Sequence, residues 1–293
     1  AVKNTPGKPL PMLPSIITVT KSPAVGFYKT YASVLQEFGN VNEVEYLIKE
    51  WDASQDWLEL EAEENQPSLS IRRVAAKDAG VFDGMNQSIA AAKGEWVLFL
   101  NAGDWLANGF GALFCEAAQA ATECDYIYCD GVTVDADDGR EFLRKAPESL
   151  QLSHFLHHAP VLHPCLIVRR SYLERHLFDL NYDLAADYAL MVDLVASGAK
   201  GRYVPVVAAF ILSGGLSERA RIRGKRQAFA SLLHHAPSFG FKIKITCAHL
   251  RFLCRHFIIV YVIRMLRPLR RLAQSRSGGQ PAGTYSNSRS VKS

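Results

Sequence analysis

Two kinds of hydrophobic pattern alternate along the first half of the chain. Short apolar runs rich in β-branched residues, Ser15–Thr20 and residues 44–48, predict buried strands. Between them, Val25–Phe38 predicts a helix that is closed by Gly39 and Asn40. A strand, a helix and a strand at this spacing form a βαβ unit with parallel strands. No Gly-x-Gly-x-x-Gly signature follows the first strand, which argues against a dinucleotide fold of the dehydrogenase kind.

The alternation continues beyond this unit. Residues 69–74 predict a third strand, and residues 81–92 predict a helix with apolar side chains on one face, ended by Gly94. Residues 96–100 are apolar on both faces, as in a buried parallel strand, and a helix is expected over 109–121. The chain is therefore predicted to be an α/β protein with a largely parallel sheet.

The second half of the chain predicts a mixture of strands, a hairpin and basic helices. The expected elements are strands over 126–129 and 165–168, a hairpin over 132–145, a helix over 187–196, strands near 203–204 and 208–212, and basic helices over 218–235 and 244–272. The predicted organisation is a flexible leader (1–14), an α/β domain (15–217), a basic helical extension (218–274) and a disordered tail (275–293).

A cluster of polar residues directly follows the apolar strand over 96–100. It comprises Asn101-Ala102-Gly103-Asp104. Open α/β sheets bind ligands just outside the carboxyl ends of their strands. A carboxylate there, on a turn made flexible by glycine, suits a hard divalent cation shared with a phosphate. An Asx turn in which Asp104 only caps the next helix explains the same residues.

Charge is divided unequally along the chain. Residues 219–293 hold 16 of the 33 Lys and Arg residues and none of the 29 Asp and Glu residues. This segment therefore carries +16 and the preceding part −12. Such a division points to an anionic partner, either nucleic acid or an anionic membrane.

Cysteine spacing and the N-terminal segment bear on the cellular compartment. The six cysteines include no Cys-x-x-Cys pair, and the polar, Pro-rich N-terminus lacks the apolar core of a signal peptide. We therefore expect reduced thiols in a cytoplasmic protein.

The stretch from residue 77 to residue 104 resembles the family 2 glycosyltransferases with the GT-A fold, especially those that build bacterial polysaccharides. Their pattern runs roughly D-x-G-(I/V)-(Y/F)-D-x-M-N-x-x-I, then A-x-G-(E/D)-(W/Y)-(I/V/L)-x-(F/W)-L-N-(A/S)-(G/D)-D. The matching residues are Asp78, Gly80, Asp83, Met85, Asn86, Ala92, Gly94, Asn101 and Asp104. The resemblance covers roughly residues 15–217 and implies a Rossmann-like, mostly parallel central sheet flanked by helices.

The resemblance implies a donor site at the strand ends. Its donor-binding residues would be Thr20, Asp52, Asp78, Asn86 and Asn101, and Asp104 would hold a divalent metal, Mn²⁺ or Mg²⁺. In the family, an acidic residue in a turn like the one around Asp52 contacts the nucleotide base. Trp51 departs from the family's turn, so a surface aspartate stays an alternative for Asp52.

Two further segments are similar to the acceptor side of the family. Asp187 matches the proposed catalytic base in the motif A-(A/S)-D-(Y/W), and it could also act as a helix N-cap. His163 matches a His-(Q/P) segment that contacts substrate, although a structural histidine fits equally. Gly214, Gly215 and Ser217 match a Gly-Gly-x-Ser loop that suits close approach to a phosphate, with a plain hairpin turn as the alternative.

Together these likenesses imply a metal-dependent, inverting transferase. It would move a sugar from a nucleoside-diphosphate sugar, with UDP expected, to a hydroxyl of a glycan or lipid-linked glycan. A nucleotidyl- or sugar-phosphate-handling enzyme should carry a phosphate loop after the first strand, where this chain has Lys21-Ser22-Pro23. The remaining alternative is a degenerate, non-catalytic GT-A domain in a protein that binds nucleic acid or a membrane.

The C-terminal segment is expected to meet a membrane surface. Over residues 250–272 the longest uncharged apolar run is 257–263, far shorter than the ~20 residues of a spanning helix. Arginines surround this run without any acidic residue, which favours a helix that lies in the interface of an anionic membrane. The expected location is the inner face of the cell membrane. Packing of this helix on the acidic body is the alternative, and no specific nucleic acid is expected.

Overall fold

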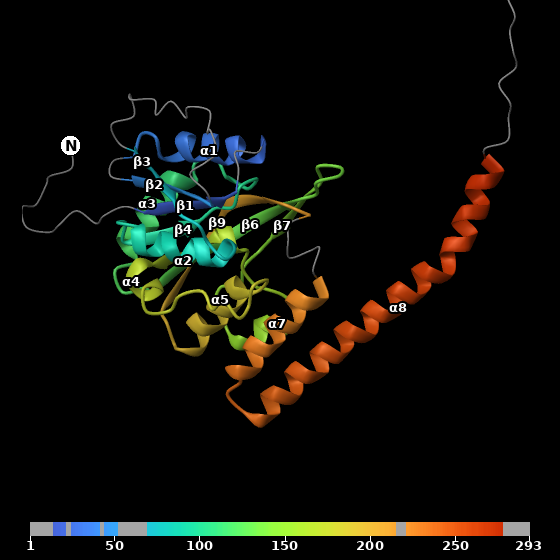
Figure 1. Cartoon of the computed structure of the whole chain (residues 1–293). Coiled ribbons are helices and arrows are strands. Elements are labelled where there is room, and N and C mark those ends of the chain that lie inside the picture. The colour runs from blue at the N-terminus through green and yellow to red at the C-terminus, as the bar shows by residue number, and fades with distance from the viewer. Residues whose placement is uncertain (1–13, 22–24, 42–43, 52–68, 215–220, 278–293) are drawn as a thin grey trace, which may run out of the picture. The chain divides into compact units, whose positions relative to one another are not determined.

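The computed structural model describes residues 14–21, 25–41, 44–51, 69–214 and 221–277. The chain divides into two compact units, Ala1–Ile245 and Thr246–Ser293. A nine-stranded sheet lies in the first unit, in the order β3-β2-β1-β4-β8-β6-β9-β5, with β7 paired to β6 (Figure 1). The strands are β1 (Ser15–Thr20), β2 (Val44–Glu50), β3 (Leu69–Ala75), β4 (Trp96–Phe99), β5 (Trp105–Leu106), β6 (Tyr126–Val134), β7 (Glu141–Arg144), β8 (Leu166–Arg169) and β9 (Gly201–Leu212).

One half of the sheet is parallel and the other half is mixed. Strands β3, β2, β1 and β4 run parallel to one another, as the sequence predicts. Strand β8 is antiparallel to both β4 and β6, whereas β6 and β9 are parallel. The carboxyl ends of β1 to β4 therefore lie at the same edge as the amino end of β8. This edge is where an α/β sheet is expected to receive a ligand.

Helices of the first unit lie on both faces of the sheet. The helices of the described residues are α1 (Val25–Phe38), α2 (Val81–Ala91), α3 (Phe110–Ala120), α4 (Arg170–Leu173), α5 (Ala186–Ala196), α7 (Arg221–His234) and α8 (Phe239–Ser277), with 3-10 turns η1 (Leu152–Leu156) and η2 (His163–Cys165). The β1–α1–β2 and β3–α2–β4 crossovers progress in opposite directions along the sheet. Right-handed crossovers then place α1 and α2 on opposite faces, as Figure 1 shows.

Large apolar side chains fill the space between these layers. Phe27 and Phe38 of α1 and Tyr46 of β2 are fully buried, and the Phe38 ring meets Phe114 of α3 edge-on at 6.5 Å between centroids. This aromatic contact joins α1 to α3. Burial of each such ring stabilises the fold by about 1.5–3 kcal/mol.

Strand β9 differs from its prediction. The two strands expected near 203–204 and 208–212 are one continuous strand. The interruption in the sequence signal is Pro205, which lacks an N–H to donate. The pairing of β9 with β6 skips from Val204 opposite Cys129 to Val207 opposite Asp130, so a bulge accommodates the proline without ending the strand.

The C-terminal helices also differ from their predicted limits. Helix α7 joins the sheet unit through the segment before α5, because Gln227 accepts a hydrogen bond from Leu184 N (2.9 Å) and donates one to Asp183 (2.6 Å). Helix α8 begins at Phe239 and reaches Ser277, beyond the predicted 244–272. Within the described part of the chain, no helix has the length and apolar character needed to cross a membrane. The predicted leader lies outside the described residues, and so does the tail from residue 278 onward.

Candidate active site

The turn after β4 is fixed by α1. Thr30 of α1 donates its hydroxyl to Asp104 O at 2.6 Å and accepts the N–H of Gly103 at 2.9 Å. Gly103 has φ +109°, a conformation that side chains rarely adopt, and a Cβ added to Gly26 would lie 3.1 Å from its Cα. Asp104 N also donates to Asn101 O at 3.0 Å. The predicted polar cluster is thus a rigid turn at the edge of the sheet.

The Asp104 carboxylate is buried within this turn, with 5% of the residue exposed. Its Oδ1 accepts the N–H of Leu212 at 3.1 Å and its Oδ2 accepts Asn101 Nδ2 at 3.2 Å. Burial raises the pKa of Asp104 to about 6, while these two hydrogen bonds act in the opposite direction. The alternative of a helix cap is excluded, because Gly109 is the N-cap of α3 and no side chain caps it.

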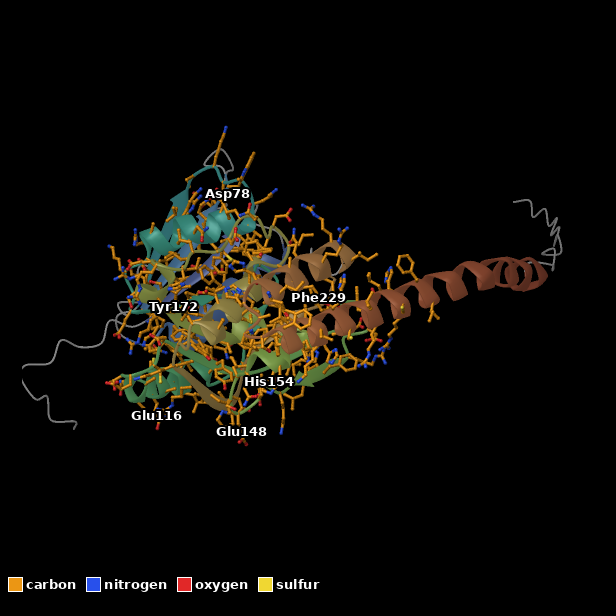
Figure 2. All side chains as sticks on the ribbon, turned by 90° about the horizontal axis from the view of Figure 1, so that it is seen from below. Asp78, Glu116, Glu148, His154, Tyr172 and Phe229 are labelled. Atoms are coloured by element: carbon orange, nitrogen blue, oxygen red, sulfur yellow. The ribbon has the colours of Figure 1, made fainter. Side chains whose placement is uncertain are left out.

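Asp78 carries its own counter-charge, unlike Asp104. It lies in the loop after β3, beside the first turn of α2 (Figure 2), and its Oδ2 is 2.9 Å from Nζ of the fully buried Lys49. Lys49 Nζ also donates to the carbonyls of Glu50 (2.8 Å) and Ala76 (2.5 Å). Because all three ammonium protons are used, Lys49 fixes both the charge and the position of Asp78.

The side-chain amide of Asn86 in α2 is hydrogen-bonded to the backbone of Phe178. Its Nδ2 donates to Phe178 O and its Oδ1 accepts Phe178 N, both at 2.9 Å. Its role as a donor contact therefore stays a prediction that no contact in the structure supports. The ring of Phe178 packs against His163, with centroids 5.7 Å apart, and against Phe99 at 5.3 Å.

His163 and Asp187 interact electrostatically. His163 opens η2 ahead of β8 and stacks on Phe99 of β4, with ring centroids 5.6 Å apart. Burial lowers the pKa of His163, and the negative charge of Asp187 acts in the opposite direction. Asp187 lies in the first turn of α5 and is part-exposed, so its carboxylate can reach a ligand. It is not the N-cap, which is Ala185.

Two further predicted residues, Thr20 and Gly214, lie at the same edge. Thr20 ends β1 and is 9% exposed, and Gly214 follows β9 with φ +92°. Asp52, Gly215 and Ser217 lie outside the described residues, so their roles stay predictions.

Sequence reasoning missed Lys49 and the two backbone partners, Leu212 and Phe178. A signal for Lys49 was present, because a lysine in a strand that is otherwise buried on both faces requires a counter-charge. No sequence signal marks the backbone groups, since any residue type supplies them.

Several solved structures share this mixed α/β architecture. No protein-family model and no curated protein sequence matches the chain. Residues 1–349 of S. aureus TarS match with 16% identity and a TM-score of 0.60, over 82% of this chain and 71% of that chain. The same protein in complex with UDP-GlcNAc matches with 17% identity and a TM-score of 0.57, over 84% and 73%.

A second neighbour is another glycosyltransferase. The mannosyltransferase PcManGT from Pyrobaculum calidifontis, in complex with GDP-Man and Mn²⁺, matches with 15% identity and a TM-score of 0.53. The match covers 94% of this chain and 88% of that chain. At these identities the likeness establishes a shared mixed α/β fold.

The carboxylate of Asp104, in the turn after β4, has the chemistry of a ligand for a divalent metal. No three His, Cys, Asp or Glu side chains among the described residues gather into a metal site. Asp104 is nevertheless a buried carboxylate without a basic partner in the described part of the chain, and each of its oxygens keeps a second lone pair. Mg²⁺ is often held by one or two carboxylates together with substrate phosphates. Asp104 fits that kind of site, and Asp78, neutralised by Lys49, does not.

Proposed function

We propose that this chain is a GT-A glycosyltransferase of the kind that builds bacterial cell-surface polysaccharide. It moves one sugar from a nucleoside-diphosphate sugar, with a UDP-sugar as the expected donor, to an acceptor hydroxyl with inversion. The observation that carries this proposal is the buried Asp104 carboxylate, bonded to Asn101 in the turn after β4, with His163 stacked on Phe99 at the end of the same strand. The UDP-GlcNAc and GDP-Man bound to the structural neighbours support it.

Asp187 is the proposed base. An acceptor hydroxyl is too weak an acid to attack a sugar carbon unaided, so a positioned carboxylate must take its proton as the new bond forms. Asp187 is part-exposed at the amino end of α5, and His163 lies beside it. Because its pKa is lowered, His163 is neutral near pH 7 and can exchange hydrogen bonds with the acceptor.

Asp104 is the proposed metal-binding residue, and Asn101, a proposed donor-binding residue, positions it. A bound Mn²⁺ or Mg²⁺ would supply Lewis-acid neutralisation of the departing diphosphate. The side chains of this chain contribute the anionic Asp104 carboxylate and the Asn101 amide that holds it, 3.2 Å away.

Donor binding tests the proposal directly. A nucleotide sugar at one hundred times its Kd should stabilise the protein by about 2.7 kcal/mol, which raises the Tm by several degrees. We expect such a rise with one member of a panel of UDP-, GDP- and dTDP-sugars when Mn²⁺ is present. Asp104→Asn should abolish the contribution of Mn²⁺, and Asp138→Asn, in the exposed hairpin turn, should retain it.

The same measurements distinguish failure of the proposed function from failure of the role proposed for Asp104. If no nucleotide sugar raises the Tm, the chain is not a transferase of this class. If Asp104→Asn keeps the full Mn²⁺-dependent rise, the metal is held elsewhere and only the role of Asp104 is wrong.

For α8 we propose an interfacial position on an anionic membrane. Leu250, Phe257 and Ile258 are 54%, 64% and 62% exposed and share one face of the helix at i, i+7 and i+8. Arg251 and Arg255 border this face. An apolar face edged by arginines is the arrangement that inserts into the headgroup region, and each arginine near such a surface adds roughly 1 kcal/mol of binding. The enzyme would then act at the inner face of the cell membrane, on a lipid-linked acceptor.

Liposome flotation tests this position. The full chain should float with vesicles rich in anionic lipid and remain behind with neutral vesicles. Leu250→Glu combined with Phe257→Glu should abolish flotation, whereas Leu113→Glu with Ile222→Glu, also at exposed apolar positions, should not. If the unmodified chain fails to float at low salt, α8 packs against protein and not against a membrane.

A further inference from the structure

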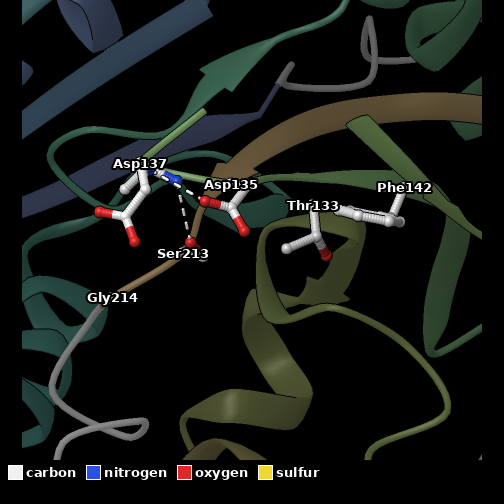
Figure 3. A pocket seen from close by; sticks show the side chains of 7 residues that line it. Thr133, Asp135, Asp137, Phe142, Ser213 and Gly214 are labelled. Carbon is white, nitrogen blue, oxygen red and sulfur yellow. Dashed lines mark hydrogen bonds between the residues drawn. The ribbon is translucent and has the colours of Figure 1, made fainter. Parts of the chain in front are cut away.

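A polar cleft lies beside the candidate active site, between the β6–β7 hairpin and the end of β9 (Figure 3). Its volume is about 440 Å³, which is enough for a sugar ring. The residues that line it are Thr133, Asp135, Ala136, Asp137, Phe142, Ser213 and Gly214. Of these, only Gly214 matches the family motifs described above.

Hydrogen bonds hold the walls of this cleft in place. Ser213 Oγ accepts the N–H of Ala136 at 3.0 Å, and Asp135 Oδ1 accepts the N–H of Asp137 at 2.9 Å, as Figure 3 shows. Ser213 N donates to Val134 O at 2.8 Å, which continues the pairing of β9 with β6. The hairpin is thereby tied to β9.

The cleft adjoins the turn that holds Asp104. Ser213 directly follows Leu212, whose N–H donates to Asp104 Oδ1 at 3.1 Å. A molecule seated against Ser213 and Gly214 therefore lies next to the proposed donor-binding edge. This is the location that a second substrate requires.

The lining chemistry selects the kind of ligand. The carboxylates of Asp135 and Asp137 accept hydrogen bonds from hydroxyl or ammonium groups, and Thr133 and Ser213 add hydroxyls. The Phe142 ring, in a residue that is 49% exposed, offers an apolar face. Among the described residues that line the cleft there is no Lys or Arg, and Arg140, which lies 5.9 Å from the centre of the Phe142 ring, is paired with Asp138 at 2.7 Å. A phosphate or uronate would therefore meet the like charges of Asp135 and Asp137.

We propose that this cleft binds the acceptor glycan through a neutral or amino sugar, and that it disfavours anionic sugars. The inference rests on the proposed transferase function and specifies the acceptor class that this function would use. The carboxylates hold the hydroxyl or amino groups of the sugar, and the Phe142 ring covers its C–H face.

Saturation-transfer NMR on the full chain tests the inference. The probes are N-acetylglucosamine, glucosamine, methyl glucoside, glucuronic acid and glucose 6-phosphate, each at millimolar concentration. We expect signals from the first three probes only. Phe142→Ala should weaken this binding by roughly five-fold, since one aromatic contact is lost.

Leu143→Ala is the matched control. Leu143 is the next residue on β7, similarly exposed at 54%, and its side chain points to the other face of the strand. Binding should be unchanged in this variant. Equal weakening in both variants, a preference for glucuronic acid, or no signal from any probe would overturn the inference. The donor-induced rise in Tm serves as an independent readout: if it persists while the sugars fail to bind, only the acceptor inference is wrong.

Discussion

Replacing Lys49 by methionine should lower the free energy of unfolding by about 3–5 kcal/mol, the range found when one partner of a buried ion pair is removed. Lys49 is fully buried, and the Asp78 side chain paired with it is 4% exposed. Methionine fills a similar volume but leaves the carboxylate and two carbonyl oxygens without their donor. Urea denaturation of the full chain measures the change.

Lys200→Met is the control for the loss of stability expected in Lys49→Met. The side chain of Lys200 is 68% exposed and lies 3.6 Å from Glu123, so its removal should change stability by less than about 1 kcal/mol. Adding Asp78→Asn to Lys49→Met should recover part of the loss, because the buried charge then disappears. If Lys49→Met and Lys200→Met are equally stable, the buried ion pair between Lys49 and Asp78 does not stabilise this edge of the sheet.

Asp187→Asn should reduce turnover by roughly 10²–10⁴ without weakening donor binding, since general base catalysis contributes that much. The amide has the shape of the carboxylate but cannot accept the proton of the acceptor hydroxyl. Single-turnover transfer and donor-induced thermal stabilisation, measured on the same sample, separate the two effects.

Asp183→Asn is the control for the base. Asp183 lies four residues earlier, at the exposed surface, and pairs with Arg223 at 2.6 Å. Its amide variant should keep turnover within about two-fold, because a surface ion pair contributes at most about 1 kcal/mol to stability. Loss of donor binding together with stability in Asp187→Asn would instead make Asp187 a structural residue.

The elements of the first half of the chain could be predicted well from sequence. β1 and α1 have the bounds that their apolar patterns predict, because short β-branched runs and a helix closed by glycine are local signals. β9 was divided in two because a proline normally ends a strand, and the bulge opposite Asp130 that tolerates it depends on the neighbouring strand.

The candidate site was predictable only in part. Asn101 and Asp104 follow a strand, so their position at the sheet edge follows from local pattern. The hydrogen-bond partners of Asp104 do not follow from local pattern, because Leu212 is 108 residues away in the chain and supplies only its backbone N–H. The proximity of His163 to Asp187 likewise depends on how η2 and α5 pack, for which a single sequence carries no signal.

The two hydrogen bonds between Asn86 and Phe178 have a consequence for protein engineering. They join α2 to the segment that leads into α5, 92 residues later. Because both bonds use the backbone N–H and C=O of residue 178, a chimaera that takes its C-terminal half from another protein can keep them whatever residue stands there. It must instead retain an asparagine at position 86 and the backbone position of residue 178.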